Sequence, residues 1–331
     1  MGQLVEGSWQ SEEQAFGRRG DGHFVRRDSS FRNWVTADGS PGPTGDGGFP
    51  AEPGRYHLYV SLACPWAHRT LIFRALKRLE ATITVSVVDP LMGRDGWAFS
   101  APDGSITPGS THDDLHGARL LSEIYLKADP HYSGRVTVPV LWDKRRNTIV
   151  NNESSEIIRM LNRAFDRWGD TSVDLCPPDL ADEIDRINAI VYNSVNNGVY
   201  KCGFATTQAA YETAFDELFR TLDELEARLS HQRYLAGPRM TEADWRLFTT
   251  LVRFDAVYYG HFKCNLRRLI DYPHLWNYAR ELYQIAGVAE TVNLVQIKRH
   301  YYASHVNINP TGIVPKGPAI DFTAPHDRAR L

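Results

Sequence analysis

The segment 61–70, SLACPWAHRT, carries the residue in this chain that is best suited to chemistry, Cys64. A strand-type run, RYHLYVSLA, leads into it, and Pro65 opens a segment with apolar residues at helical spacing. This order predicts a sulfur at a helix N-terminus, where backbone N–H groups and the helix dipole stabilise a thiolate. Proline suits the first helical turn because its missing N–H costs nothing there. We interpret Cys64 as a nucleophile; the alternative is a buried structural thiol.

The thiol has no partner nearby in the sequence. Ala67 stands where a C-x-x-C motif would have its second cysteine, while His68 and Arg69 add positive charge close to Cys64. A single thiolate can form a mixed disulfide but needs an external thiol to resolve it. In a cytosol the abundant thiol is glutathione, so the pattern favours thiol transfer over disulfide isomerisation.

The remaining cysteines and the histidines give no sign of a disulfide or a metal site. Cys176, Cys202 and Cys264 lie far from Cys64 and from each other. The histidines show no H-E-x-x-H or similar spacing. We therefore expect no metal, and we interpret the other three cysteines as buried structural thiols.

Length and charge limit the possible function classes. The chain has 331 residues, enough for two domains, and a formal net charge of -3. That charge gives no support for a nucleic-acid or membrane-surface partner, and no apolar run is long enough to span a membrane. The N-terminus lacks the basic and apolar regions of a secretory signal, so we expect a cytoplasmic protein.

Strands and helices alternate over residues 56–165, in the order β-α-β-α-β-β-α. The first strand should bury Tyr56, Leu58 and Val60 on one face, and the last two strands, 138–143 and 147–151, should form a hairpin. This predicts an α/β domain that positions Cys64 between a strand and a helix. Residues 90–115 look like a loop.

The rest of the chain divides by composition. Residues 1–55 form an irregular Gly- and Pro-rich extension, 166–180 a linker marked by Pro177-Pro178, and 303–331 an extended tail. Residues 181–302 carry apolar side chains at i, i+3, i+4 spacing and predict an all-helical domain, in which Thr241 and Asp244 form a variant capping box.

Two further groups of residues could join Cys64. Val138-Pro139 starts a strand; an ordinary trans proline at a sheet edge is one interpretation. The order of elements, however, resembles the thioredoxin fold, in which this proline is cis and frees the preceding backbone for a bound thiol peptide. Glu153 and Ser154 stand at a helix entry, where N–H groups and a hydroxyl suit a carboxylate and Glu153 can pair with an α-amino group.

An α/β domain with this site, followed by a helical domain, resembles the glutathione transferases. The segments CPWAHR (64–69), RVTVPVLWD (135–143), NNESSEI (151–157), NNGVYKCGFATTQ (196–208) and RFDAVYYGHFKCN (253–265) are similar to the glutathionyl-hydroquinone reductases, the Xi class. The resemblance covers nearly the whole chain. It implies a thioredoxin-like N-terminal domain, an all-α C-terminal domain, glutathione as co-substrate and a homodimer.

The resemblance also implies a reaction and a set of site residues. Cys64 would attack the sulfur of a glutathionyl-hydroquinone, and a second glutathione would resolve the mixed disulfide to give oxidised glutathione. Glutathione contacts carry over to Trp97, Arg135, Val136, Thr137, Val138, Glu153 and Ser154, and Pro139 is expected to be cis.

Protonation of the aromatic ring needs an acid, and tyrosine suits that role. By resemblance, Tyr200 is the proton donor or acceptor, while Tyr258 and Tyr301 stabilise the thiolate. Tyr259 and Tyr302 are adjacent alternatives for the last two. Two other functions stay open at this point: an Omega-like thiol transferase or dehydroascorbate reductase, which would not need Tyr200, and a non-catalytic ligand-binding protein of the same fold.

Overall fold

The computed structural model describes residues 2–11, 20–101 and 103–331, which form two compact units. The first unit holds residues 2–11, 28–173 and 291–300, and the second holds 20–27, 174–290 and 301–331. One boundary falls inside the expected linker 166–180. The described parts of the extension 1–55 are divided between the two units. Residues 291–300 belong to the first unit, although we expected them in the helical domain 181–302.

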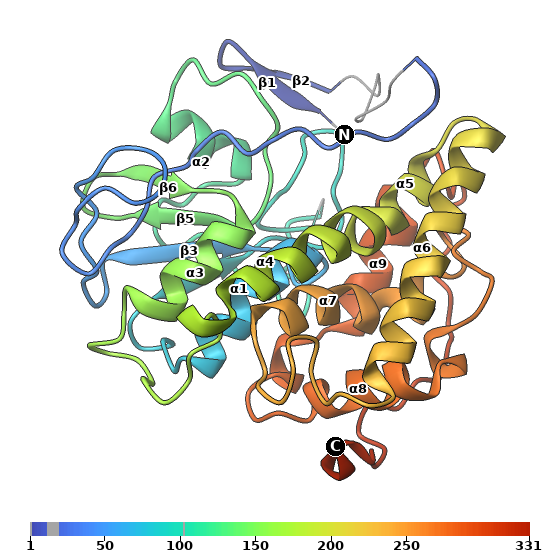
Figure 1. Cartoon of the computed structure of the whole chain (residues 1–331). Helices are drawn as coiled ribbons and strands as arrows, with labels where there is room; N and C mark the ends of the chain where they lie inside the picture. Colours follow the sequence, from blue (N-terminus) through green and yellow to red (C-terminus); the bar gives the residue numbers. More distant parts are fainter. Residues whose placement is uncertain (1, 12–19, 102) are drawn as a thin grey trace. The chain divides into compact units, whose positions relative to one another are not determined.

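A four-stranded sheet forms the centre of the first unit, in the order β4 (Thr84–Val87), β3 (Tyr56–Val60), β5 (Val140–Asp143), β6 (Thr148–Asn151) (Figure 1). β3 pairs with β4 in parallel and with β5 antiparallel, and β5 and β6 form the expected hairpin. All five residues of β3 are buried, not only the three on one face. An interior strand covered on both faces excludes water from every side chain.

Three helices accompany this sheet. α1 (Pro65–Leu76) packs against α3 (Ser154–Arg163), while α2 (Leu121–Ala128) lies beside β6, apart from that pair (Figure 1). Pro65 occupies the first turn of α1, as expected. The helix ends at Leu76, shortly before Arg78, whose φ of 53° is the left-handed conformation that terminates helices. The β3–α1 junction is therefore the feature that positions Cys64.

The N-terminal extension is less irregular than its composition predicts. β1 (Gln3–Val5) and β2 (Ser8–Gln10) form a short antiparallel hairpin. Leu4 exchanges two backbone hydrogen bonds of 2.9 Å with Gly134, directly before Arg135. Further along, Nε of Arg32 donates to Glu156 of α3 at 2.7 Å. Backbone pairing at Leu4 and this ion pair at Arg32 hold two parts of the extension within the α/β unit.

The second unit is helical. α5 (Gly198–Phe204) packs against α6 (Gln208–Leu229), α6 against α8 (Pro273–Tyr283), and α4 (Ala181–Ile190) against α7 (Glu242–Arg253). Two π-helical turns interrupt the regular pattern, Val191–Asn196 before α5 and Phe254–Tyr258 after α7. The boundary between the units lies within α9 (Leu294–Ser304), between His300 and Tyr301.

The capping box predicted at the start of α7 is confirmed. The backbone N–H of Thr241 donates to the Asp244 carboxylate at 2.7 Å. Asp244 is fully buried and also accepts a 2.7 Å hydrogen bond from the hydroxyl of Tyr278 in α8. The capping carboxylate therefore links the start of α7 to its neighbouring helix.

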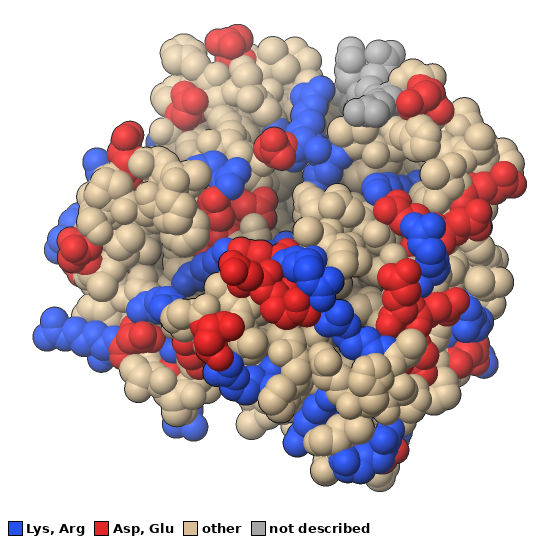
Figure 2. Space-filling model, in the orientation of Figure 1, with Lys and Arg blue, Asp and Glu red and all other residues tan. Residues whose placement is uncertain are grey.

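Charges on the surface are mixed in sign. Acidic and basic side chains are interspersed on the face that Figure 2 shows. Exposed pairs such as Arg186 with Glu183 on α4, 2.7 Å apart, contribute little stability because water screens them. Over the described ranges, none of the helices has the length and apolar character needed to cross a bilayer.

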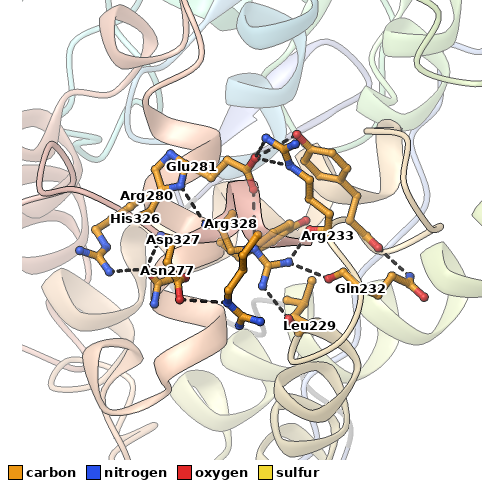
Figure 3. A network of polar contacts seen from close by, with 12 residues as sticks. Leu229, Gln232, Arg233, Asn277, Arg280, Glu281, His326, Asp327 and Arg328 are labelled. Carbon is orange, nitrogen blue, oxygen red and sulfur yellow. Dashed lines mark hydrogen bonds and ion pairs between the residues drawn. The ribbon is translucent and has the colours of Figure 1, made fainter.

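The C-terminal tail is held by one buried arginine, Arg328 (Figure 3). Its guanidinium donates to the backbone carbonyls of Leu229, Gln232 and Arg233 at 2.5, 2.7 and 2.5 Å. Leu229 is the last residue of α6, so the cation faces the negative end of the helix dipole. The counter-charge is Glu281 of α8, whose Oε2 lies 3.7 Å from Nε of Arg328.

Replacing Arg328 with alanine is expected to lower the free energy of unfolding by about 2–3 kcal/mol, since several charge-assisted hydrogen bonds are lost in a buried place. Urea unfolding of both proteins measures this. Arg330→Ala is the matched control, because Arg330 pairs with Asp327 at the exposed surface and should change stability by less than about 0.5 kcal/mol. Equal effects of the two changes would contradict the anchoring role.

Candidate functional site

Cys64 is the N-cap residue of α1, and its backbone is extended, with a φ of -76° and a ψ of 123°. Its carbonyl accepts the first helical hydrogen bond, from the N–H of His68 at 3.0 Å. The thiol is half-buried and lies 3.5 Å from the carbonyl oxygen of Val138, to which it donates. The structure thus brings Cys64 and Val138 together at the N-terminus of α1; the helix dipole there favours a thiolate, whereas the Val138 carbonyl accepts from the protonated thiol.

The residues that follow Cys64 divide between packing and charge. Ala67 is fully buried, and because it is an alanine, α1 carries no second thiol three residues after Cys64. His68 turns its ring to Thr291, with 2.7 Å between Nε2 and Oγ1. Arg69 is also buried and donates to the hydroxyl of Ser154 at 3.3 Å, with its guanidinium 4.6 Å from the ring of Trp66. The charge of Arg69 therefore reaches the Glu153–Ser154 turn.

The segment before β5 presents its backbone beside Cys64. The Val138–Pro139 peptide bond is cis, the isomer that the resemblance implies. Tyr125 of α2 holds the segment by accepting from the N–H of Thr137 (3.2 Å) and donating to its carbonyl (2.9 Å). The same hydroxyl accepts from the side chain of Asn152 at 3.1 Å. Tyr125 thus connects the backbone at Thr137 to the entry of α3.

Glu153 is the N-cap of α3 and accepts hydrogen bonds from the N–H (3.0 Å) and hydroxyl (2.9 Å) of Ser155. Ser29 of the extension donates to its other carboxylate oxygen at 3.1 Å. Burial alone would raise the pKa of Glu153, but these hydrogen bonds and the nearby charge of Arg69 hold that pKa below its ordinary value. Glu153 is therefore an anion at neutral pH, suited to an ammonium group.

The remaining glutathione-binding candidates, Trp97 and Arg135, have other surroundings. Trp97 is buried and stacks on His300 of α9, with the ring centroids 4.8 Å apart and an angle of 22° between the ring planes. Arg135 is half-buried, and its carbonyl accepts from the hydroxyl of Tyr132 at 3.2 Å. Val136, which follows Arg135 in the chain, has a buried side chain. His300 therefore supports the Trp97 ring, and the hydroxyl of Tyr132 fixes the backbone at Arg135.

The long loop around Trp97 is held by α9. Gln296 donates to the carbonyl of Pro108 at 2.9 Å, and Arg299 donates to the hydroxyl of Thr107 at 3.3 Å. Nδ1 of His300 lies 2.9 Å from the carbonyl oxygen of Pro90, and so donates to it. These contacts, between residues about two hundred positions apart, place Trp97 on a fixed loop.

The structure brings Tyr200, Tyr258 and Tyr301 together in the second unit. The hydroxyls of Tyr200 and Tyr301 are 2.6 Å apart, and those of Tyr258 and Tyr301 are 3.0 Å apart. All three side chains are buried. Tyr259 and Tyr302 are half-buried instead, and the hydroxyl of Tyr302 donates to a backbone carbonyl of the π-helical turn at 3.5 Å. The connected hydroxyls therefore belong to Tyr258 and Tyr301.

Electrostatics keep two of these phenols protonated. Burial raises the pKa of Tyr258 and of Tyr301 well above the ordinary value, and repulsion from Tyr200 adds to the shift. The fully buried Arg253, whose guanidinium donates to the carbonyl of Thr249 at 2.8 Å, opposes the shift without cancelling it. At neutral pH Tyr258 and Tyr301 are therefore neutral hydrogen-bond donors.

The other cysteines have different surroundings. None of the four cysteines, all of which lie in the described residues, forms a disulfide; Cys202 and Cys264 are buried as expected, whereas Cys176 is half-buried and not buried as the sequence predicts. Burial raises the pKa of Cys264 well above its usual value, which leaves it as an inert thiol. Among the residues that the structure describes, no group of three or more His, Cys, Asp or Glu side chains could hold a metal ion.

Known proteins are similar to this chain over nearly its whole length. The family model of the glutathione S-transferase N-terminal domain matches residues 63–164, and that of the C-terminal domain matches residues 208–281. Glutathionyl-hydroquinone reductase YqjG of Escherichia coli is 57% identical over 99% of this chain and 98% of its own length. Glutathionyl-hydroquinone reductase PcpF of Sphingobium chlorophenolicum is 54% identical over 96% and 97%.

Solved structures give the same result. The glutathione-bound structure of YqjG aligns with a TM-score of 0.91 and 54% identity, covering 100% of both chains. A Xi-class glutathione transferase from Natrialba magadii aligns with a TM-score of 0.90 and 48% identity, covering 100% of this chain and 97% of that one.

Proposed function

We propose that this chain, which belongs to the Xi class of the glutathione transferases, the glutathionyl-hydroquinone reductases, reduces S-glutathionyl-hydroquinones to hydroquinones with glutathione. Its fold, a thioredoxin-like α/β domain followed by an all-helical domain, is the one expected from the sequence. The observation that carries the proposal is the position of the Cys64 thiol, at a helix N-terminus and 3.5 Å from the Val138 carbonyl, with buried Ala67 in place of a second cysteine.

The proposed cycle has two steps. The Cys64 thiolate attacks the sulfur of the thioether, the bond between that sulfur and the ring carbon breaks, and the ring carbon takes a proton. The products are the hydroquinone and a disulfide between Cys64 and glutathione. A second glutathione then attacks this disulfide, which releases oxidised glutathione and restores the thiol. Overall, the bond from the ring carbon to sulfur is replaced by a bond to hydrogen, and the glutathionyl group of the substrate leaves with one added glutathione as oxidised glutathione.

Charges near α3 match the γ-glutamyl end of glutathione, which carries an ammonium and a carboxylate. Anionic Glu153 would bind the ammonium group. The hydroxyl of Ser154, supported by Arg69 at 3.3 Å, and the N-terminus of α3 would bind the carboxylate. The backbone of Val138 would pair with the cysteinyl part of glutathione, and Val136 and Thr137 would lie beside the bound molecule. Trp97 and Arg135 would contact the rest of glutathione.

The tyrosine cluster favours a reductase over a plain thiol transferase, which needs no proton on carbon. Tyr258 can donate to Tyr301, and Tyr301 to Tyr200, across 3.0 and 2.6 Å. In that order Tyr200 keeps its own proton to give to the ring. The two neutral phenols then stabilise the Tyr200 phenolate that results. Their expected effect on the Cys64 thiolate rests on the resemblance.

The resemblance also implies a homodimer, and dependence on glutathione fits a cytoplasmic location. Light scattering during gel filtration should give a mass near twice 37.5 kDa. A mass of one chain at micromolar concentration would contradict the dimer.

Turnover of glutathionyl-menadione or a glutathionyl-hydroquinone in the presence of glutathione tests the proposal. We expect one hydroquinone and one oxidised glutathione for each substrate consumed. A small mixed disulfide, assayed beside it, separates the alternatives: an Omega-like thiol transferase would reduce only the disulfide, and a non-catalytic protein neither substrate. Absence of hydroquinone release by the wild-type protein would refute the proposed function.

A further inference from the structure

Residues 20–27 of the N-terminal extension are fixed on the second unit beside α5. The carbonyl of Gly22 accepts from the N–H of Thr206 at 3.1 Å, and the hydroxyl of Thr207 donates to the carbonyl of Asp21 at 3.2 Å. Gly22 has a φ of 88°, and a Cβ there would lie 2.6 Å from Oγ1 of Thr207. The approach is so close that only glycine fits.

Aromatic packing continues this attachment. Phe24 is buried and stacks on Phe204, with centroids 5.6 Å apart, and on Tyr200, with centroids 6.2 Å apart. The segment therefore covers the ring of the tyrosine to which proton transfer is assigned.

Arg26, two residues further on, lies over that same ring. Its guanidinium carbon is 4.9 Å from the ring centroid of Tyr200, within the range of a cation–π contact. Nε of Arg26 donates to the side chain of Asn197 at 2.8 Å, and Asn197 directly precedes α5. The guanidinium is thus tied to the N-terminus of the helix that carries Tyr200.

We propose that Arg26 is a positioning residue for proton transfer by Tyr200, which it orients through Asn197 and whose anionic form it stabilises from the ring face. This inference rests on the proposed function. A phenolate spreads its negative charge into the ring, so a cation over the face attracts the phenolate more than the neutral phenol. The contact therefore strengthens as Tyr200 gives up its proton, which is the condition for an effect on kcat.

Other groups near Tyr200 act from different sides. Tyr301 contacts its hydroxyl at 2.6 Å, and Arg253 acts on Tyr258 and Tyr301. His261 and His305 pack against Tyr301 with ring centroids 6.5 and 5.4 Å away. Because these groups are unchanged in an Arg26 variant, a change in pH dependence between variants at position 26 reports the charge of Arg26.

Arg26→Gln keeps a hydrogen-bonding side chain and removes the charge, and Arg26→Lys keeps the charge. With glutathionyl-menadione we expect kcat of Arg26→Gln to fall about tenfold, with KM changed by less than about twofold and a larger solvent deuterium isotope effect. Arg26→Lys should recover most of kcat. Phe24→Leu, the packing control, should leave the isotope effect at the wild-type value. Formation of the Cys64–glutathione disulfide from oxidised glutathione should be equal in all four proteins.

A second measurement does not depend on turnover. In protein labelled with 3-fluorotyrosine, Tyr200→Phe identifies the ¹⁹F signal of Tyr200, which is then followed over pH. The midpoint should be higher in Arg26→Gln than in the wild type and Arg26→Lys. Equal midpoints, or equal kcat losses for Gln and Lys, would overturn the role of Arg26. If the wild-type protein shows no reductase activity while the midpoint of Tyr200 is still higher in Arg26→Gln than in the wild type, the proposed function is refuted. The interaction between Arg26 and Tyr200 then stands.

Discussion

Replacing Cys64 with alanine is expected to lower the reductase rate by about four orders of magnitude or more, since the group that forms the covalent intermediate is lost. The variant should fold normally because the helix keeps Pro65 and the backbone hydrogen bond from His68 to residue 64. Steady-state assays with glutathionyl-menadione measure the loss. Mass spectrometry after exposure to oxidised glutathione should show one glutathionyl adduct on the wild type and none on the variant.

Cys176→Ala is the matched control for this experiment. Cys176 is also half-buried and not part of a disulfide, but it belongs to the second unit and precedes the short helical turn Pro178–Leu180. Its loss should leave both the rate and the adduct unchanged. Turnover that survives in Cys64→Ala, or an adduct found mainly on Cys202 or Cys264, would show that another thiol performs the chemistry.

The elements around Cys64 could be predicted because their signals are local. A strand-type run, a Cys-Pro junction and a helical repeat follow each other within about twenty residues, and the β5–β6 hairpin also joins neighbours in sequence. The capping box at Thr241 has the same origin. Hydrogen bonds between residues two to four positions apart leave a signature in the sequence that needs no knowledge of the fold.

Long-range contacts left no such signature. The sequence indicates Arg69 only as a charge near Cys64, yet this side chain donates to Ser154, 85 positions away. Tyr125 and Ser29, which hold the Thr137 backbone and Glu153, stand in segments without a recognisable motif. Partners separated by so many residues are set by the packing of whole elements. An alternating pattern in the sequence likewise does not tell whether a strand such as β3 is covered on one face or on both.

The tyrosines lie between these cases. The sequence alone does not separate Tyr258 from Tyr259, because adjacent positions on a helix differ by about 100° and both are aromatic. The π-helical turn Phe254–Tyr258 adds a further rotation that helical spacing does not predict. The burial and hydroxyl contacts of Tyr258 separate the two in the structure. What they establish is a connected cluster, and its part in the chemistry needs a kinetic experiment.

Tyr200→Phe is that experiment, and it should lower kcat for glutathionyl-hydroquinones by about a hundredfold or more, the range expected for losing a general acid. The ring, and with it the packing on Phe204 and Phe262, is retained, so the fold should be intact. The attack of Cys64 on a simple disulfide needs no proton on carbon. Reduction of a small glutathionyl mixed disulfide should therefore proceed at the wild-type rate.

Tyr259→Phe provides the matched control, because it removes a hydroxyl directly after the π-helical turn and leaves the hydroxyls of Tyr200, Tyr301 and Tyr258 in place. Its kcat should stay within about twofold of the wild type. If Tyr200→Phe retains full reductase activity, proton transfer belongs to another group while the thiol step stands. If it loses both activities equally, Tyr200 acts on the Cys64 step or on folding, and only the selective loss supports a proton delivered to the ring carbon.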